Sequence, residues 1–110
     1  MCILDDRIIN LLEELKNHYG MYIGKKDLNL LITFIYGCLH GIFIESGEII
    51  EFLPEFQEFV QKYYGINRNI HVIQHWTNII IFFTATEEEA FDEFYTLIDK
   101  YNKHNSETHK

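Results

Sequence analysis

The residues best suited to metal binding in this chain are two histidines in its second half. His71 and His75 are four residues apart, the spacing at which two imidazoles on one helix can share a metal ion. No glutamate lies between them as in metallopeptidases, and the nearest acidic residues are far along the chain. Ordinary surface or half-buried histidines explain the pair better. We therefore predict no metal site and no cofactor.

Nucleophilic catalysis would need a serine, cysteine or threonine held beside a base. Cys38 lies in an apolar stretch, where it is expected to behave as a small hydrophobic residue. Ser46 and Ser106 lie in a predicted turn and in the tail, and glycines do not flank them as in a nucleophile elbow. The chain also has no glycine-rich phosphate loop. The sequence predicts no catalytic residue and no enzymatic activity.

Acidic residues are the more informative group, because they gather in two stretches that contain no lysine or arginine. The stretches are residues 45–58 and 87–99. Exposed helix faces usually mix charges of both signs, whereas like charges this close repel each other. A basic partner would relieve that repulsion. The predicted partner-binding residues are Glu45, Glu48, Glu51, Glu55, Glu58, Glu87, Glu88, Asp92 and Glu93.

The whole chain is acidic, with 17 Asp and Glu against 9 Lys and Arg and a net charge of −8. Such a surface repels nucleic acid and anionic membranes and attracts basic proteins. The alternative is that the acids only keep a cytosolic protein soluble. Total charge alone favours that alternative. The separation of the acids from all bases in two stretches instead favours binding of a basic partner protein.

The length of 110 residues and the hydrophobic content of 47% fit one domain, residues 1–110, with a flexible tail at 103–110. Folding should leave about 6,400 Å² exposed of about 19,000 Å². The N-terminus does not resemble a signal peptide and two cysteines do not make a disulfide framework, so we expect a cytoplasmic protein. The apolar stretch 28–44 contains polar residues and falls short of a membrane span. It is expected to be a buried central helix.

Apolar spacing predicts a mainly α, single-domain bundle of about five helices. The first covers residues 5–19, and residues 21–24 form a bridge to a second helix that starts at Asp27 and continues to about residue 44. There, Gly37 and Gly41 would let a neighbouring helix approach closely, unless Gly37 ends the helix early. A third helix begins near Pro54 and closes at Gly65. Thr86 and Glu89 form a capping box for the last helix.

The segment 78–84 is ambiguous. Its β-branched and aromatic residues favour a strand, but it does not alternate cleanly and no second strand is visible to pair with it. A buried helix over about 74–83 explains it nearly as well, and we favour the helix. The alternative is an α+β fold with a short strand near 78–84.

The order of several short motifs resembles a group of small bacterial proteins found beside polymorphic toxins, including immunity proteins of contact-dependent growth inhibition systems. The similar residues run from about residue 11 to residue 101. They are Met21, Tyr22, Ile23 and Gly24; Leu28, Leu31, Phe34, Ile35 and Gly37; Leu53, Pro54, Glu55, Phe56, Phe59 and Val60; Trp76, Ile79 and Ile80; and Glu87, Glu88, Glu89, Ala90, Phe91, Asp92, Phe94, Leu97 and Ile98.

This resemblance implies an immunity protein that binds and neutralises a cognate toxin domain, often a nuclease, inside the cell that makes it. The partner would be a basic protein, met by the acidic residues named above. The alternative function is that of a homo-oligomeric structural or adaptor protein whose Tyr- and Phe-rich faces meet each other. A homodimer is compatible with both functions.

Overall fold

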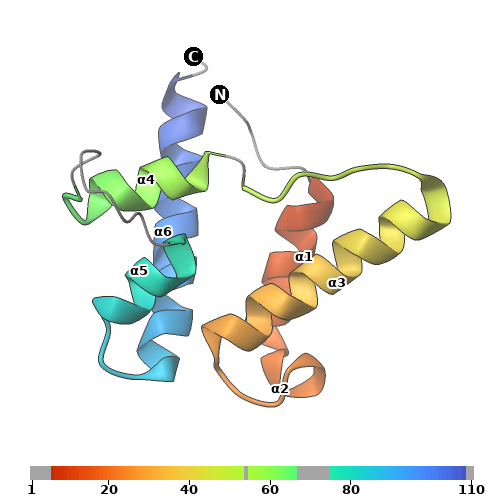
Figure 1. Cartoon of the computed structure of the whole chain (residues 1–110), viewed down its shortest axis with the longest axis horizontal. Helices are drawn as coiled ribbons and strands as arrows, with labels where there is room; N and C mark the ends of the chain where they lie inside the picture. Colours follow the sequence, from red (N-terminus) through yellow and green to blue (C-terminus); the bar gives the residue numbers. More distant parts are fainter. Residues whose placement is uncertain (1–5, 54, 67–74, 109–110) are drawn as a thin grey trace.

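The computed structural model describes residues 6–53, 55–66 and 75–108, with side chains as far as residue 104, and this part of the chain is helical without a strand. The helices are α1 (Asp6–Asn17), α2 (Tyr19–Tyr22), α3 (Leu28–Ser46), α4 (Phe56–Tyr63), α5 (Trp76–Phe82) and α6 (Glu87–Thr108) (Figure 1). The predicted mainly α class is confirmed. The alternative strand near 78–84 is wrong, because α5 occupies most of that segment.

The starts of α3 and α6 follow the predicted capping residues. The side chain of Asp27 accepts a hydrogen bond from the Leu30 backbone N–H at 3.0 Å. The Thr86 hydroxyl accepts one from the Glu89 N–H at 3.1 Å, and the Glu89 carboxylate accepts one from the Ala85 N–H at 3.0 Å. The carboxylate thus reaches one residue beyond the cap, and the Thr86 hydroxyl satisfies the otherwise free N–H of Glu89 in the first turn.

An aromatic cluster joins α4, α5 and α6. The ring of Trp76 stands perpendicular to that of Phe56 at 4.9 Å between centroids, and it stacks on that of Phe94 at 5.3 Å. Tyr101 meets Phe56 edge-on at 5.4 Å. All four side chains are buried. This packing explains why the β-branched segment after Trp76 is a helix, since tertiary contacts outweigh local strand preference.

Two irregular segments expected from the sequence are helical instead. Residues 19–22 form the short helix α2, where the start of a bridge was predicted. The expected flexible tail at 103–110 is largely part of α6, which continues to Thr108. Polar composition led to the prediction of a tail, but a helix that is anchored by Leu97, Ile98 and Tyr101 can extend into solvent. Pro54 and His71 lie outside the described residues.

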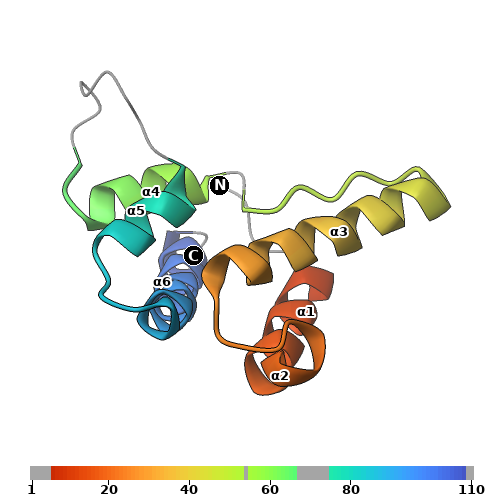
Figure 2. The ribbon, with the colours of Figure 1, turned by 60° about the horizontal axis from the view of Figure 1, so that its bottom comes forward.

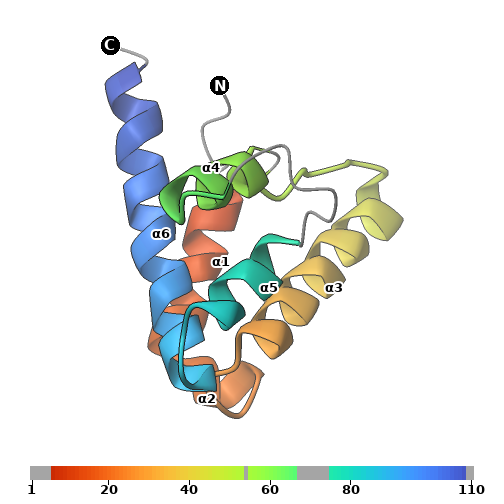
Figure 3. The same cartoon turned by 60° about the vertical axis from the view of Figure 1, so that its left-hand side comes forward.

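Helix α3 differs most from expectation. Leu28, Leu31, Ile32 and Ile35 are buried against the body, but every later residue of the helix is half-buried or exposed. Figures 2 and 3 show the second half of α3 leading away from the other helices and the chain returning beside it. We call residues 36–53 the arm. The prediction of a helix packed on several sides is therefore wrong for the second half of α3.

Among the described residues, α3 is also long and apolar enough to cross a membrane by length and composition, a test that core helices of soluble proteins pass as well. Only 22% of its most apolar window is buried in the fold. The apolar character of α3 therefore exceeds what the body of the molecule covers.

Neighbouring leucines on α3 give a direct test of its two faces. Leu31 is fully buried, whereas Leu30 is 42% exposed. We expect Leu31→Ala to lower the free energy of unfolding by about 2–5 kcal/mol, because it leaves a cavity. Leu30→Ala should change it by less than about 0.5 kcal/mol. Urea unfolding followed by circular dichroism measures both, and equal losses would contradict the orientation of α3.

Candidate protein-binding surface

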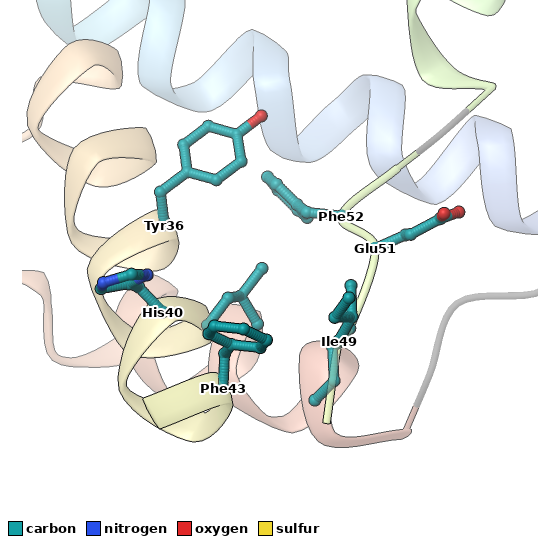
Figure 4. A pocket seen from close by; sticks show the side chains of 8 residues that line it. Tyr36, His40, Phe43, Ile49, Glu51 and Phe52 are labelled. Carbon is teal, nitrogen blue, oxygen red and sulfur yellow. The ribbon is translucent and has the colours of Figure 1, made fainter. Parts of the chain in front are cut away.

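The arm contains an apolar groove of about 510 Å³ between the second half of α3 and the returning chain (Figure 4). Its lining residues are Tyr36, Leu39, His40, Phe43, Ile49, Ile50, Glu51 and Phe52. The rings of Tyr36 and Phe52 meet edge-on at 5.8 Å and close one end. Phe43 and Ile49 remain 45% and 76% exposed. Such large exposed apolar side chains in one concave place are typical of a binding surface.

The end of α3 and one ion pair determine the path of the chain in the arm. Gly47 has a φ of 74°, so it ends α3 in the left-handed conformation, and its N–H donates to the Phe43 carbonyl. The Ser46 hydroxyl accepts a hydrogen bond from the Glu48 N–H. Both carboxylate oxygens of Glu48 then accept hydrogen bonds from the Arg7 guanidinium, at 2.7 and 2.9 Å. This pair ties the returning chain of the arm to α1.

The first group of predicted partner-binding acids surrounds the arm and the start of α4. Glu51 lies on the rim of the groove with its carboxylate pointing away from the apolar lining (Figure 4). Glu45 is exposed near the end of α3, and Glu55 is half-buried before α4. Glu48 is bound to Arg7, and Glu58 lies 3.9 Å from Lys62. Three of the five acids, Glu45, Glu51 and Glu55, thus form no ion pair within the described part of the chain.

The second group lies on the first turns of α6, and two of its four acids are paired with bases from elsewhere. Glu87 is 3.2 Å from Lys25, and Asp92 is 3.2 Å from Lys26. The pKa of Lys26 is raised, chiefly by its hydrogen bond to Asp92 and by the charge of that carboxylate. These pairs join α6 to the connection between α2 and α3. The sequence separated these acids from all bases, but the fold brings two lysines to them.

The remaining acids of this group have mixed environments. Glu88 is exposed, and Glu93 is half-buried. Burial raises the pKa of Tyr64 to about 12, with smaller contributions from the charges of Glu93 and Tyr63. The nine predicted residues therefore do not form one surface. In the described part of the chain, Glu45, Glu51 and Glu55 form no ion pair in or beside the arm, and Glu88 and Glu93 form none on α6.

Two of the residues considered for metal binding or catalysis, His75 and Cys38, lie in the part of the chain that the structure describes. The His75 side chain caps α5 and lies 2.8 Å from the Thr77 hydroxyl, while His71 is outside the described residues. Burial raises the pKa of the Cys38 thiol, which favours its protonated, less nucleophilic form. In the part of the chain that the structure describes, no three His, Cys, Asp or Glu residues are close enough together to hold a metal ion.

No family model matches this chain, and neither a curated protein nor a solved structure does. Of the groove residues, the sequence predicted only Glu51 as part of a binding site, because Tyr36, His40 and Phe43 were expected in a buried helix. One signal was present: the apolar pair Ile49 and Ile50 interrupts the first acidic stretch. A return of the chain beside an apolar helix would explain that pair.

The ion pair between Arg7 and Glu48 predicts different effects for two acids of the arm. Glu48→Gln should lower the free energy of unfolding by about 0.5–1 kcal/mol at low salt, since the pair is bidentate but half-exposed. Glu51→Gln should leave it unchanged within about 0.3 kcal/mol, because it breaks no ion pair within the described residues. Thermal unfolding at low and high salt compares the two variants. Equal losses would show that Glu48 does not anchor the arm.

Proposed function

We propose that this protein is a non-enzymatic inhibitor that binds a basic partner protein at the groove of the arm. The observation that carries the proposal is an apolar groove whose surroundings hold carboxylates without counter-ions. Apolar side chains supply contact area that loses water on binding, and unpaired carboxylates select a partner of opposite charge. The groove offers both within one short segment of the chain.

The apolar lining would provide the anchoring contacts. Phe43 and Ile49 are exposed from opposite walls of the groove, so a partner side chain inserted there would touch both. Tyr36 and Phe52 form its closed end. Interfaces of this kind concentrate their binding free energy in a few well-packed apolar or aromatic contacts.

The acids in and beside the arm suit fast association with a partner bound in the groove, because they lie close to it. Glu45, Glu51 and Glu55 form no ion pair in the described part of the chain, whereas in the α6 group Glu87 and Asp92 already face lysines and Glu88 and Glu93 do not. Unpaired acids at a rim speed the encounter with a basic protein and lose this effect as salt increases. We therefore assign the interface to the first acidic group and a secondary, structural role to the second.

The resemblance to immunity proteins suggests the identity of the partner. Toxin nucleases carry basic clefts that bind the phosphates of nucleic acid. The arm (Figures 2 and 3), with carboxylates beside its groove, can occupy such a cleft or its margin and so block access to the substrate. We propose that the partner is a toxin domain of this class, encoded beside the gene for this chain.

The test is binding of the purified chain to the C-terminal domain encoded by the adjacent upstream gene. Phe43→Ala should weaken binding by about thirtyfold, mainly through faster dissociation, because it removes an anchoring contact. Glu45→Lys combined with Glu51→Lys should slow association by about tenfold at low salt, and the difference should fade at high salt. Surface plasmon resonance across a salt series measures both effects.

A matched control changes the same net charge elsewhere. Glu13→Lys with Asp99→Lys alters exposed acids of α1 and α6 outside the groove, so it should affect association less. Equal slowing by both double variants would reduce the electrostatic effect to total charge and contradict the assigned surface. An upstream gene without a toxin-like domain would argue against the inhibitor function itself.

A further inference from the structure

The chain that returns beside α3 has the geometry of a β-strand. We call residues 48–52 of it the return segment. Residues 48–51 belong to no helix or turn, and Figures 1 and 2 show the chain there running back lengthwise beside α3. Successive side chains point to opposite sides: the buried ring of Phe52 meets that of Tyr36, while the exposed Glu51 points away from the groove (Figure 4). Such alternation is typical of an extended strand.

Four successive residues of the return segment leave their backbone hydrogen-bonding groups unused. In the part of the chain that the structure describes, the N–H and C=O groups of residues 49–52 form no hydrogen bond. By contrast, the Glu48 N–H donates to the Ser46 hydroxyl, and the Leu53 C=O accepts from the Phe56 N–H. Backbone donors and acceptors are strong hydrogen-bonding groups. Residues 49–52 therefore offer a short, open edge to a second strand.

The side chains of the return segment favour a strand that the described chain does not complete. Ile49, Ile50 and Phe52 are β-branched or aromatic, the types that are enriched in strands. Proteins usually protect a free strand edge with lysine, with proline or with a covering element. Residues 48–52 contain neither lysine nor proline, and Ile49 is 76% exposed. An open edge of this kind is suited to strand addition by a binding partner.

The fold already holds the return segment in its extended form. Arg7 binds the Glu48 carboxylate at one end, and Phe52 is buried at the other. Between them, Ile50 packs against the hydrophobic core. An isolated pair of strands is only marginally stable in water, whereas packing against a helix stabilises it. Helix α3 would support a strand added here, and the fixed segment would lose little conformational entropy on pairing.

We propose that the basic partner binds by strand addition, with one of its extended segments paired to the backbone of residues 48–52. This inference rests on the proposed function, because it specifies how the same site recognises its partner. Charge and burial select the occupant. Lysine or arginine would lie opposite Glu51, which forms no ion pair within the described residues, and apolar side chains opposite Ile50 and Phe52 would cover the groove. The occupant is therefore a strand that alternates basic and apolar side chains.

A second copy of this chain is a poorer occupant of the same edge. Pairing two return segments would bring Glu48 and Glu51 of one copy close to those of the other, and like charges on adjacent strands destabilise a pair. The net charge of −8 adds to that repulsion. Both terms change sign for a basic strand.

The test combines the purified full chain with a synthetic peptide of alternating lysine and valine, about eight residues long. One edge of a strand presents the N–H groups of every second residue. With the peptide at about ten times its Kd, two alternate amides among residues 49–52 should therefore exchange with water about tenfold more slowly. The two other amides should keep their rates. Exchange rates of single amides, measured by NMR, give this pattern directly.

Matched peptides separate backbone pairing from attraction between charges. One carries N-methyl groups on its lysines and another on its valines, so each lacks the N–H donors of one edge but keeps every charge. One of the two should bind at least about tenfold more weakly than the parent peptide. Equal binding by all three, or no binding at up to about 1 mM, would overturn the proposal.

Two charge variants test the place of binding. Glu51→Lys should weaken binding of the parent peptide about fivefold at low salt, because it puts like charges on adjacent strands. Asp99→Lys makes the same change of charge at an exposed acid of α6 and should have a smaller effect. Equal weakening by both variants would contradict binding at the return segment. Slower exchange of alternate amides in the chain alone, as its concentration increases, would assign the edge to a second copy and also overturn the proposal.

The same exchange measurement with the C-terminal domain encoded by the adjacent upstream gene separates strand addition from the inhibitor function. A domain that binds without slowing alternate amides would leave the inhibitor function intact and overturn strand addition. Pairing with the peptide but no binding of the domain would support strand addition and contradict the toxin as partner.

Discussion

The contact of Trp76 with Phe56 and Phe94 is the interaction on which the rest of the structure depends. It joins one side chain from each of α4, α5 and α6, with ring centroids 4.9 and 5.3 Å apart. These contacts hold α4 and α5 against α6, while α3 buries only the residues of its first half. The second half of α3 and the chain that follows it then extend past the body, and the proposed binding surfaces arise there.

The sequence was sufficient for the helices and their starts but not for what they pack against. Asp27 and Thr86 cap their helices through local hydrogen bonds, which depend on neighbours in sequence. The second half of α3 still carries Leu39, Ile42, Phe43 and Ile44, so apolar residues alone could not separate exposed from buried turns. That difference depends on where the other helices end, which is a property of the whole fold.

The ion pairs of the acidic residues could not be predicted from the sequence either. Two stretches without a base look alike in sequence, yet in the fold Lys25 and Lys26 form ion pairs with acids of the second stretch. In the first, Arg7 binds Glu48 while Glu45 and Glu51 form no ion pair in the described part of the chain. Long-range pairs of this kind cannot be deduced from spacing along the chain. They distinguish two stretches that look equivalent in sequence, since only the second pairs acids with Lys25 and Lys26.

The glycines of α3 have a consequence for motion as well as for contact. Each costs a helix about 1 kcal/mol relative to alanine, and in the arm little tertiary packing compensates for that loss. The last turns of α3 should therefore open and close locally, many times for each unfolding of the body. Amide hydrogens there would exchange faster than those of α6. A partner that binds the arm would select one conformation from this ensemble and stabilise it.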